Sequence, residues 1–178
     1  MHGKRVKSDF WKSLPDLNRE DAKWIAAVLD CEGTISVHTP WNKKRNNRNI
    51  VVFAKVEMIG YAIVERLHIL CGGSLWKNIR QKGNRREHCL WNITSNGLRW
   101  LLPQIMPFLL IKKRHAEIVL EVLLNNERGK RPTQMKYERL AELLTEIRKL
   151  NGRGLTPDLR KIIPTRVQGK DVICLKKP

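Results

Sequence analysis

The sequence is short of several features that would assign it to other protein classes. No apolar run in its 178 residues approaches the roughly 20 residues needed to span a bilayer, so a membrane protein is not expected. The segment from Met1 to Leu14 is basic and has no apolar core, which argues against a secretory signal peptide. The four cysteines form no Cys-x-x-Cys pair and no regular histidine spacing accompanies them, which argues against a zinc site.

Acidic residues are also scarce. The chain has 17 Asp and Glu against 35 Lys and Arg, which gives a formal net charge of +18. Such an excess attracts polyanions through its long-range field and through counterion release from phosphates, so nucleic acid is the predicted partner class. Unpaired cysteines fit a reducing compartment. We therefore expect an intracellular protein (in the cytoplasm, a nucleoid or an organelle matrix) that is not secreted.

Periodicity and turn residues predict the order helix, strand, strand, helix, strand, strand, helix, with extra helices after it. Asn18 is suited to cap a first helix that runs to about Cys31 and stops at Gly33. Gly72-Gly73 ends the second helix, and Pro103 breaks the third. The remaining elements are expected at residues 34–39, 49–57, 59–70, 74–79, 88–94, 96–106, 112–125 and 134–150.

Four strands in two hairpins predict an α+β fold with one antiparallel sheet, helices on one face and a wet opposite face. We expect a basic N-terminal extension over residues 1–13, a core domain over 14–127 and a C-terminal helical extension of the same domain over 128–178. The wet face and its loops would carry Ser36, His38, Lys43, Lys44, Arg45, Arg48, Lys55, Lys77, Arg80, Arg85 and Arg86.

Two motifs carry charge where a helix disfavours it. Residues 24–33, Trp-Ile-Ala-Ala-Val-Leu-Asp-Cys-Glu-Gly, form an apolar helix that ends on Asp30 and Glu32, although a helix C-terminus repels acids. Residues 107–116, Pro-Phe-Leu-Leu-Ile-Lys-Lys-Arg-His-Ala, start a helix with cations, which the dipole also opposes. A bound cation would explain the first motif and an anionic neighbour the second. A buried helix with a chance acidic cap, and a basic helix start in solvent, are the plainer readings.

Together these motifs resemble the LAGLIDADG homing endonucleases of the single-motif, homodimeric type. The resemblance covers about residues 14–125, and it includes the helix end at residues 64–73 and the stretch at residues 93–98. It implies the LAGLIDADG fold (αββαββα), with a four-stranded antiparallel DNA-binding sheet and helices on its other face.

The resemblance also implies an active site. Glu32 would bind a divalent metal, Mg²⁺ or Mn²⁺, where the family often has Asp, and the adjacent Cys31 is a second candidate ligand. Lys112 would polarise water or shield phosphate charge. Glu57 is the candidate for a further polar residue at the end of the second strand. Asp30 would cap or pair at the helix junction.

The chain has one copy of the signature helix, since no repeat of it occurs between residues 110 and 178. One copy supplies one key carboxylate, so a two-fold dimer would bring two Glu32 residues together. Ala26 and Ala27, with Asp30, are the residues expected at the helix–helix interface.

A β-ribbon fits the major groove, so alternate strand residues would reach base edges while loop cations hold phosphates. Ser36, His38 and Lys55 are candidate base readers. Lys43, Lys44, Arg45, Arg85 and Arg86 are candidate phosphate anchors, and each of these cations could equally be a solvated charge. The remaining candidate DNA-binding residues are Arg48, Lys77, Arg80 and Arg114.

The predicted function is therefore an intron-encoded, sequence-specific endonuclease that hydrolyses both strands of a long, roughly two-fold-symmetric DNA site as a homodimer, using divalent metal. Two alternatives use the same fold. One is a maturase whose partner is intron RNA, and the other is a DNA-binding protein that has lost its catalytic activity. Glu32 and Lys112 favour the nuclease, because RNA binding alone needs no metal carboxylate.

Overall fold

The computed structural model describes residues 11, 14–42, 47–79, 88–125 and 134–152. Along the chain, one helix is followed by four strands, a second helix, two further strands and three more helices. Their bounds are α1 Arg19–Glu32, β1 Gly33–His38, β2 Trp41–Asn42, β3 Asn47–Arg48, β4 Val51–Met58, α2 Tyr61–Cys71, β5 Ser74–Ile79, β6 His88–Thr94, α3 Ser95–Ile105, the 3-10 turn η2 Met106–Phe108, α4 Lys113–Asn125 and α5 Gln134–Leu150.

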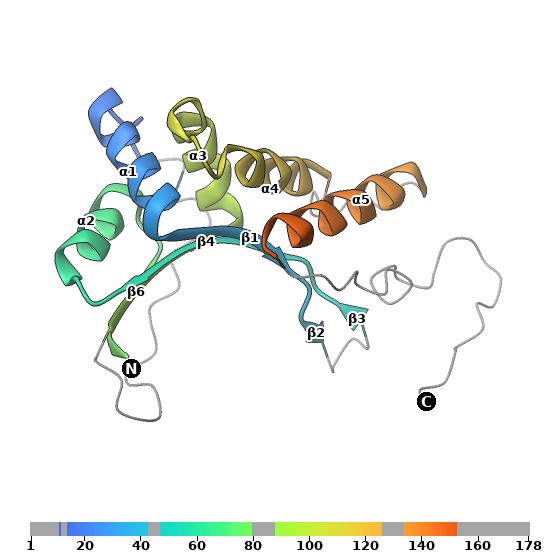
Figure 1. Cartoon of the computed structure of the whole chain (residues 1–178), viewed down its shortest axis with the longest axis horizontal. Coiled ribbons are helices and arrows are strands. Elements are labelled where there is room, and N and C mark those ends of the chain that lie inside the picture. The colour runs from blue at the N-terminus through green and yellow to red at the C-terminus, as the bar shows by residue number, and fades with distance from the viewer. Residues whose placement is uncertain (1–10, 12–13, 43–46, 80–87, 126–133, 153–178) are drawn as a thin grey trace.

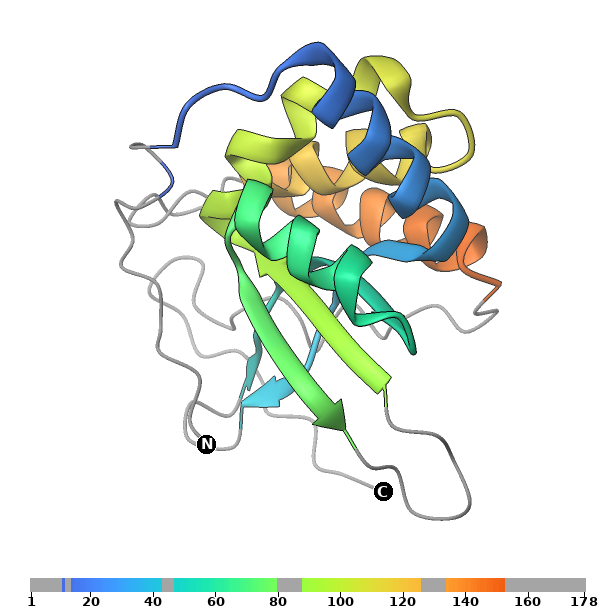
Figure 2. The ribbon, with the colours of Figure 1, turned by 90° about the vertical axis from the view of Figure 1, so that its left-hand side faces the viewer.

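The fold is α+β, as expected, with one four-stranded antiparallel sheet in the order β1-β4-β6-β5. The five helices of the described chain lie on one side of this sheet, and the sheet curves away from them (Figure 1). The side view shows the same separation of layers (Figure 2). We call the side of the sheet opposite the helices the open face. A short two-stranded hairpin, β2–β3, extends from the end of β1 within residues predicted to be a loop.

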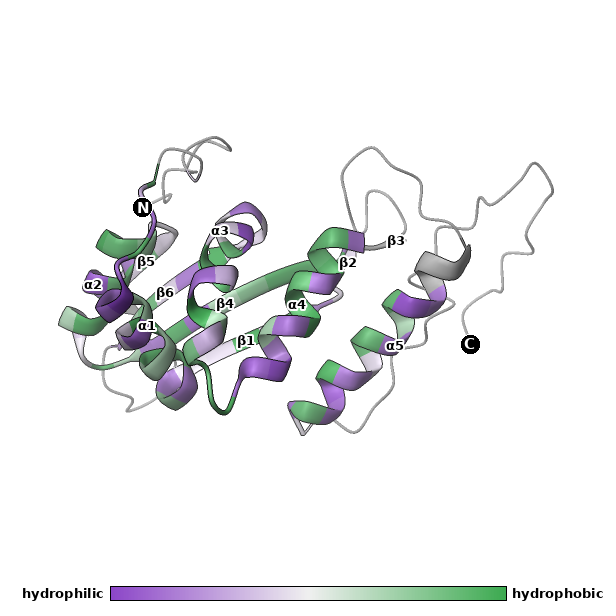
Figure 3. Cartoon of the chain, turned by 90° about the horizontal axis from the view of Figure 1, so that it is seen from above, coloured by the Kyte–Doolittle hydropathy of each residue, from purple (hydrophilic) through white to green (hydrophobic). Residues whose placement is uncertain are grey.

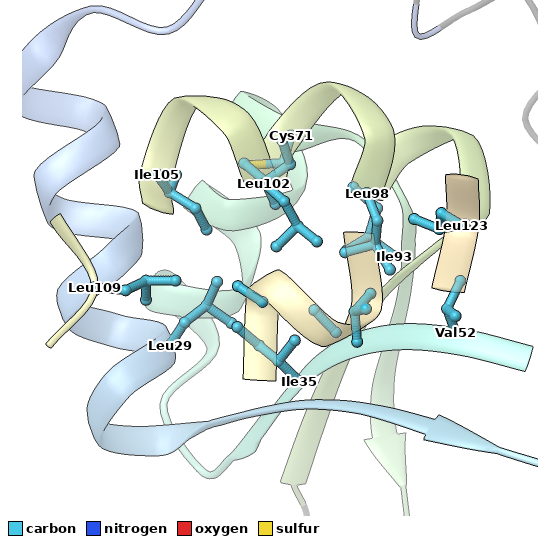
Figure 4. Packing of buried hydrophobic residues seen from close by; sticks show 14 of the residues in the cluster. Leu29, Ile35, Val52, Cys71, Ile93, Leu98, Leu102, Ile105, Leu109 and Leu123 are labelled. Atoms are coloured by element: carbon cyan, nitrogen blue, oxygen red, sulfur yellow. The ribbon is translucent and has the colours of Figure 1, made fainter. Parts of the chain in front are cut away.

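Strand alternation places the core between the sheet and the helices. Ile35 of β1, Ala54 and Val56 of β4, and Trp91 and Ile93 of β6 are at most 1% exposed. They meet apolar side chains from α1, α3 and α4, such as Leu29, Leu102 and Leu123 (Figure 4). Each such leucine stabilises the fold by about 1.5–3 kcal/mol relative to an exposed position. This layer fixes α1 against β1 and β4, where the candidate site lies.

Two turn predictions are confirmed by backbone geometry. Asn18 caps α1, since its side-chain oxygen accepts a hydrogen bond from the Asp21 N–H at 2.8 Å. Gly72 and Gly73 end α2 with φ of 62° and 87°, the left-handed region that glycine adopts readily. The Pro103 prediction was only partly right, because α3 continues to Ile105 and then tightens into η2.

The C-terminal helix α5 is an integral part of the core. Leu140, Leu143, Leu144 and Ile147 are buried in this core, and α4 and α5 lie side by side (Figure 3). Two inter-helix ion pairs, Arg114 with Glu146 and Arg139 with Glu121, flank that contact. None of the described helices is long and apolar enough to cross a membrane.

Candidate active site and nucleic-acid interface

The candidate site begins where α1 passes directly into β1. Glu32 is the last residue of α1, and Gly33 is the first of β1, so no loop separates them. A Cβ added at Gly33 would lie 2.7 Å from the Leu29 Cα and 2.8 Å from the Leu29 carbonyl oxygen, which only glycine avoids. Gly33 therefore lets the backbone at Glu32 pass directly from the helix into the sheet.

Asp30 clamps this junction to the segment before α4. Its carboxylate is only 8% exposed and accepts hydrogen bonds from the backbone N–H groups of Leu110 (2.7 Å) and Lys112 (2.8 Å). Lys112 returns the contact, because its ammonium donates to the carbonyl oxygens of Leu29 (2.8 Å) and Asp30. The C-terminal end of α1 carries partial negative charge, which repels the two acids. The Lys112 ammonium offsets that charge. The predicted structural role of Asp30 at the junction is confirmed.

The clamp shifts the ionisation of Asp30. Burial opposes its charge, but the N–H groups of Leu110, Lys112 and Ile111 and the charge of Lys112 outweigh burial and hold the pKa of this carboxyl below its ordinary value. The ionised form thus stabilises the folded chain. That stabilisation is complete above the ordinary aspartate pKa of about 4 and is lost as pH falls through the lower folded-state pKa.

Asp30→Asn is therefore expected to lower the free energy of unfolding by about 1–3 kcal/mol at neutral pH, because the neutral amide accepts these hydrogen bonds less strongly. Urea unfolding of both proteins at several pH values measures the difference. It should shrink as pH falls below about 4, where the wild-type carboxylate becomes protonated. A difference that stays constant down to the acid limit would contradict the clamp.

Glu32 differs from Asp30 in having no partner among the described residues. Its side chain is exposed, and no hydrogen bond or ion pair joins it to any described residue. A carboxylate at the negative end of a helix, left without a cation of its own, is poised to bind one from solution.

Glu57 and Glu32 lie at the same end of the β1–β4 strand pair. Gly33 pairs with Val56, so Glu32 precedes one partner and Glu57 follows the other. Glu57 is on the open face, where its carboxylate lies 2.8 Å from His88 Nε2 and accepts from Lys55 Nζ at 3.3 Å. Sequence reasoning singled out Glu57 and Lys55 but missed His88, although strand alternation in β6 would have placed His88 on the same face.

The donor set at this junction suits a hard divalent ion. Glu32 and Glu57 supply carboxylate oxygens, the ligands that Mg²⁺ prefers, and Cys31 next to Glu32 is exposed. Among the residues that the structure describes, no three His, Cys, Asp or Glu side chains lie close enough together to hold a metal ion.

The open face carries some of the predicted DNA-binding side chains. His38 is exposed there with its ring 5.1 Å from that of Phe53, and Lys55 is 38% exposed beside Glu57. Lys43, Lys44, Arg45, Arg80, Arg85 and Arg86 lie outside the described residues, and Arg48 is described only as backbone of β3.

Three of the predicted DNA-binding side chains are engaged by contacts within the chain, and one of them, Lys77, lies on the helical face of the sheet and not on the predicted wet face. Lys77 lies on the same face of β5 as Leu75, toward the helices, where its ammonium lies 3.8 Å from the centroid of the Tyr61 ring and 3.9 Å from Glu65. Ser36 is on the open face but 6% exposed, because the Asn151 side-chain amide donates to its hydroxyl at 3.0 Å. Arg114 is ion-paired to Glu146 and Glu117 on the helical layer.

The residues expected between two subunits divide into buried and exposed ones. Ala26 is fully buried in the chain's own core and Asp30 is engaged in the clamp, so neither offers an outer surface. Ala27 is exposed, and so is Cys31 one turn later. Sequence reasoning missed the large apolar side chains nearby: Leu110 is 89% exposed and Ile111 is 71% exposed, on the segment that Asp30 holds.

No protein-family model and no curated protein matches the chain. Solved structures do match it over most of its length. The homing endonuclease I-CvuI, in complex with its target in the presence of calcium, is 18% identical with a TM-score of 0.65, over 80% of this chain and 92% of its own. The archaeal intron-encoded homing endonuclease I-Vdi141I, complexed with DNA, is 17% identical with a TM-score of 0.64, over 80% and 92%.

The I-SmaMI LAGLIDADG homing endonuclease bound to cleaved DNA is 22% identical with a TM-score of 0.60, over 89% of this chain and 53% of its own. This chain has the LAGLIDADG homing endonuclease fold. Within that fold, α1 is the helix that ends on the two acids, and the chain spans about half the length of I-SmaMI. At these identities the likeness establishes the fold, and the activity has to be argued from the site.

Proposed function

We propose that the chain is a sequence-specific, metal-dependent DNA endonuclease that acts as a homodimer. The observation that carries this proposal is the unpaired, exposed Glu32 at the α1–β1 junction, held beside the open face by the clamp between Asp30 and Lys112. A net charge of +18 supports a polyanionic substrate. The fold neighbours I-CvuI and I-Vdi141I were solved in complex with DNA.

In this proposal each residue of the junction has a separate task. Glu32 holds Mg²⁺ or Mn²⁺, which when bound stabilises charge on phosphate oxygens and lowers the pKa of bound water. Lys112 has three ammonium donors, and the two α1 carbonyls leave one for a phosphate oxygen or an ordered water. Glu57 accepts a hydrogen bond from a water near the reacting phosphate.

The homodimer follows from the number of carboxylates and from the exposed apolar surface. One chain supplies one Glu32, and phosphodiester hydrolysis on both strands calls for a second. Ala27 and Cys31 on α1, with Leu110 and Ile111 beside them, form an apolar dimer patch that a second copy would cover. I-SmaMI is about twice as long as the part matched by this chain, so two copies would supply a comparable amount of fold.

The open face would lie along the major groove, with His38 and Lys55 toward base edges. The cations at residues 43–48 and 80–86 would hold phosphates. Such a protein acts inside the cell, where the free thiols of Cys31, Cys71 and Cys89 stay reduced.

Cleavage of a randomised plasmid library tests the proposal. The protein is incubated with the library in Mg²⁺ and, in parallel, in EDTA, and cut ends are sequenced. We expect metal-dependent double-strand cuts at one long, roughly two-fold-symmetric site. Binding to a DNA site without cleavage would favour a DNA-binding protein that has lost its catalytic activity. Binding only to structured RNA would favour the maturase. Either outcome would overturn the nuclease.

A further inference from the structure

Glu57 is in an unexpected place for an interface that attracts DNA. It is an acid on the open face of a strongly basic chain, at the end of the sheet where Glu32 lies. A carboxylate there is repelled by phosphates and weakens DNA binding. Its presence at this position therefore suggests a role other than binding. Its side chain is 34% exposed, so part of it remains available to solvent or to a ligand.

Two neighbours on the same face fix this carboxylate. His88 Nε2 lies 2.8 Å from Oε1, within ion-pair distance, and Lys55 Nζ donates to Oε2 at 3.3 Å. Glu57 pairs with Leu90 across the β4–β6 ladder, so His88 is its diagonal neighbour two residues along β6. The two contacts are unequal, because the His88 side chain is only 11% exposed whereas that of Lys55 is 38% exposed.

The burial and the shorter contact make His88 the rigid partner. An imidazole has two side-chain torsions and is held here by the strands on either side, whereas a lysine has four torsions and a flexible end. Lys55 can therefore move to a phosphate or a base when DNA arrives. His88 then still holds the Glu57 carboxylate from the side of β6.

We propose that His88 is a positioning residue of the active centre, which holds the Glu57 carboxylate in the orientation that faces bound DNA beside Glu32. This inference rests on the proposed nuclease function, and it assigns to His88 a role that acts only through Glu57. His88 does not touch the reacting atoms. Loss of the contact lets the carboxylate rotate toward Lys55 or solvent, so cleavage slows while DNA binding is kept.

The test compares His88→Leu with His88→Gln. The glutamine amide can place a donor near the position of Nε2, whereas leucine keeps apolar volume without a donor. Single-turnover cleavage in Mg²⁺ and DNA affinity in EDTA are measured for each. We expect His88→Leu to slow cleavage roughly 10-fold, as loss of a group that orients an active-site carboxylate does, with affinity changed less than about twofold. His88→Gln should recover most of the rate.

A double-mutant cycle with Glu57→Ala separates positioning from a general structural effect. If His88 acts through Glu57, His88→Leu has no further effect once Glu57 is alanine. Lys55→Met is the matched control on the other carboxylate oxygen and should slow cleavage less than His88→Leu. His88→Thr, a strand-forming residue too short to reach Glu57, replaces His88→Leu if that variant does not fold.

Three results would overturn the inference: equal losses for leucine and glutamine at position 88, a His88→Leu effect that adds to that of Glu57→Ala, or a loss of affinity with an unchanged cleavage rate. If His88→Leu cuts DNA as fast as the wild type, only the role of His88 is refuted. A wild-type protein without metal-dependent cleavage refutes the proposed function itself.

Discussion

Replacing Glu32 by glutamine is expected to slow DNA cleavage by roughly a thousandfold, a rise of about 4 kcal/mol in the activation barrier, while DNA affinity is nearly unchanged. The substitution keeps the size of the side chain and removes only its charge, at a side chain that has no partner among the described residues. The folded chain therefore loses no contact, whereas a divalent ion loses its principal carboxylate.

The measurement is single-turnover cleavage of the selected site at saturating protein, with binding measured separately in EDTA. Glu20→Gln is the matched control, because Glu20 is an exposed glutamate at the opposite end of α1 that pairs with Lys23 at 2.8 Å. The control should cleave like the wild type. A Glu32→Gln protein that retains its cleavage rate would remove Glu32 from the active site.

The second large effect is expected at the dimer patch. Leu110→Asp combined with Ile111→Asp should convert the dimer into a monomer and abolish double-strand cleavage. Both side chains are largely exposed in the single chain, so the change should cost the monomer little. In a dimer it would bury four carboxylates without partners, each of which costs several kcal/mol.

Sedimentation with and without DNA measures the assembly, and Asp30 provides an internal check. The clamp bonds to Asp30 use backbone N–H groups, so the double variant should keep the wild-type unfolding free energy. Leu124→Asp is the matched control. It changes a 56% exposed leucine at the far end of α4, about 17 Å along that helix from its first turn. A double variant that still sediments as a dimer would place the interface elsewhere.

Local signals were sufficient for most of the elements. Asn18 predicted the start of α1, and Gly72-Gly73 predicted the end of α2, because each depends on contacts within a few residues. The helix–sheet layering followed from alternation of apolar residues in the strands. The β2–β3 hairpin was missed because its sequence is polar and basic, without the alternation that marks a strand.

The candidate site was harder to predict, because its contacts join distant parts of the chain. Ser36 is covered by Asn151, 115 residues away, and Arg114 pairs with Glu146, 32 residues away. Neither pairing has a local signal. Lys77 is different, because the two-residue strand period places it on the same face as the apolar Leu75, which is the helical face.

The exposure of Leu110 and Ile111 could not be read from the sequence either. They follow Leu109, which is 3% exposed, so composition alone makes the three residues equivalent. The Asp30 carboxylate distinguishes them, because its bonds to the N–H groups of Leu110 and Lys112 fix the path of this segment. Only the folded structure shows that two of these three side chains face outward.

Double-strand cleavage should need one Glu32 from each of two subunits. Wild-type and Glu32→Gln chains are refolded together in known ratios, and double-strand cleavage is measured at constant total protein. Random pairing predicts that activity follows the square of the wild-type fraction, so an equal mixture should retain about a quarter of the wild-type cleavage. An equal mixture that retained about half of the wild-type cleavage would show that the chains act independently, and one that retained about three quarters would show that one Glu32 per dimer is enough. Either result would contradict this requirement.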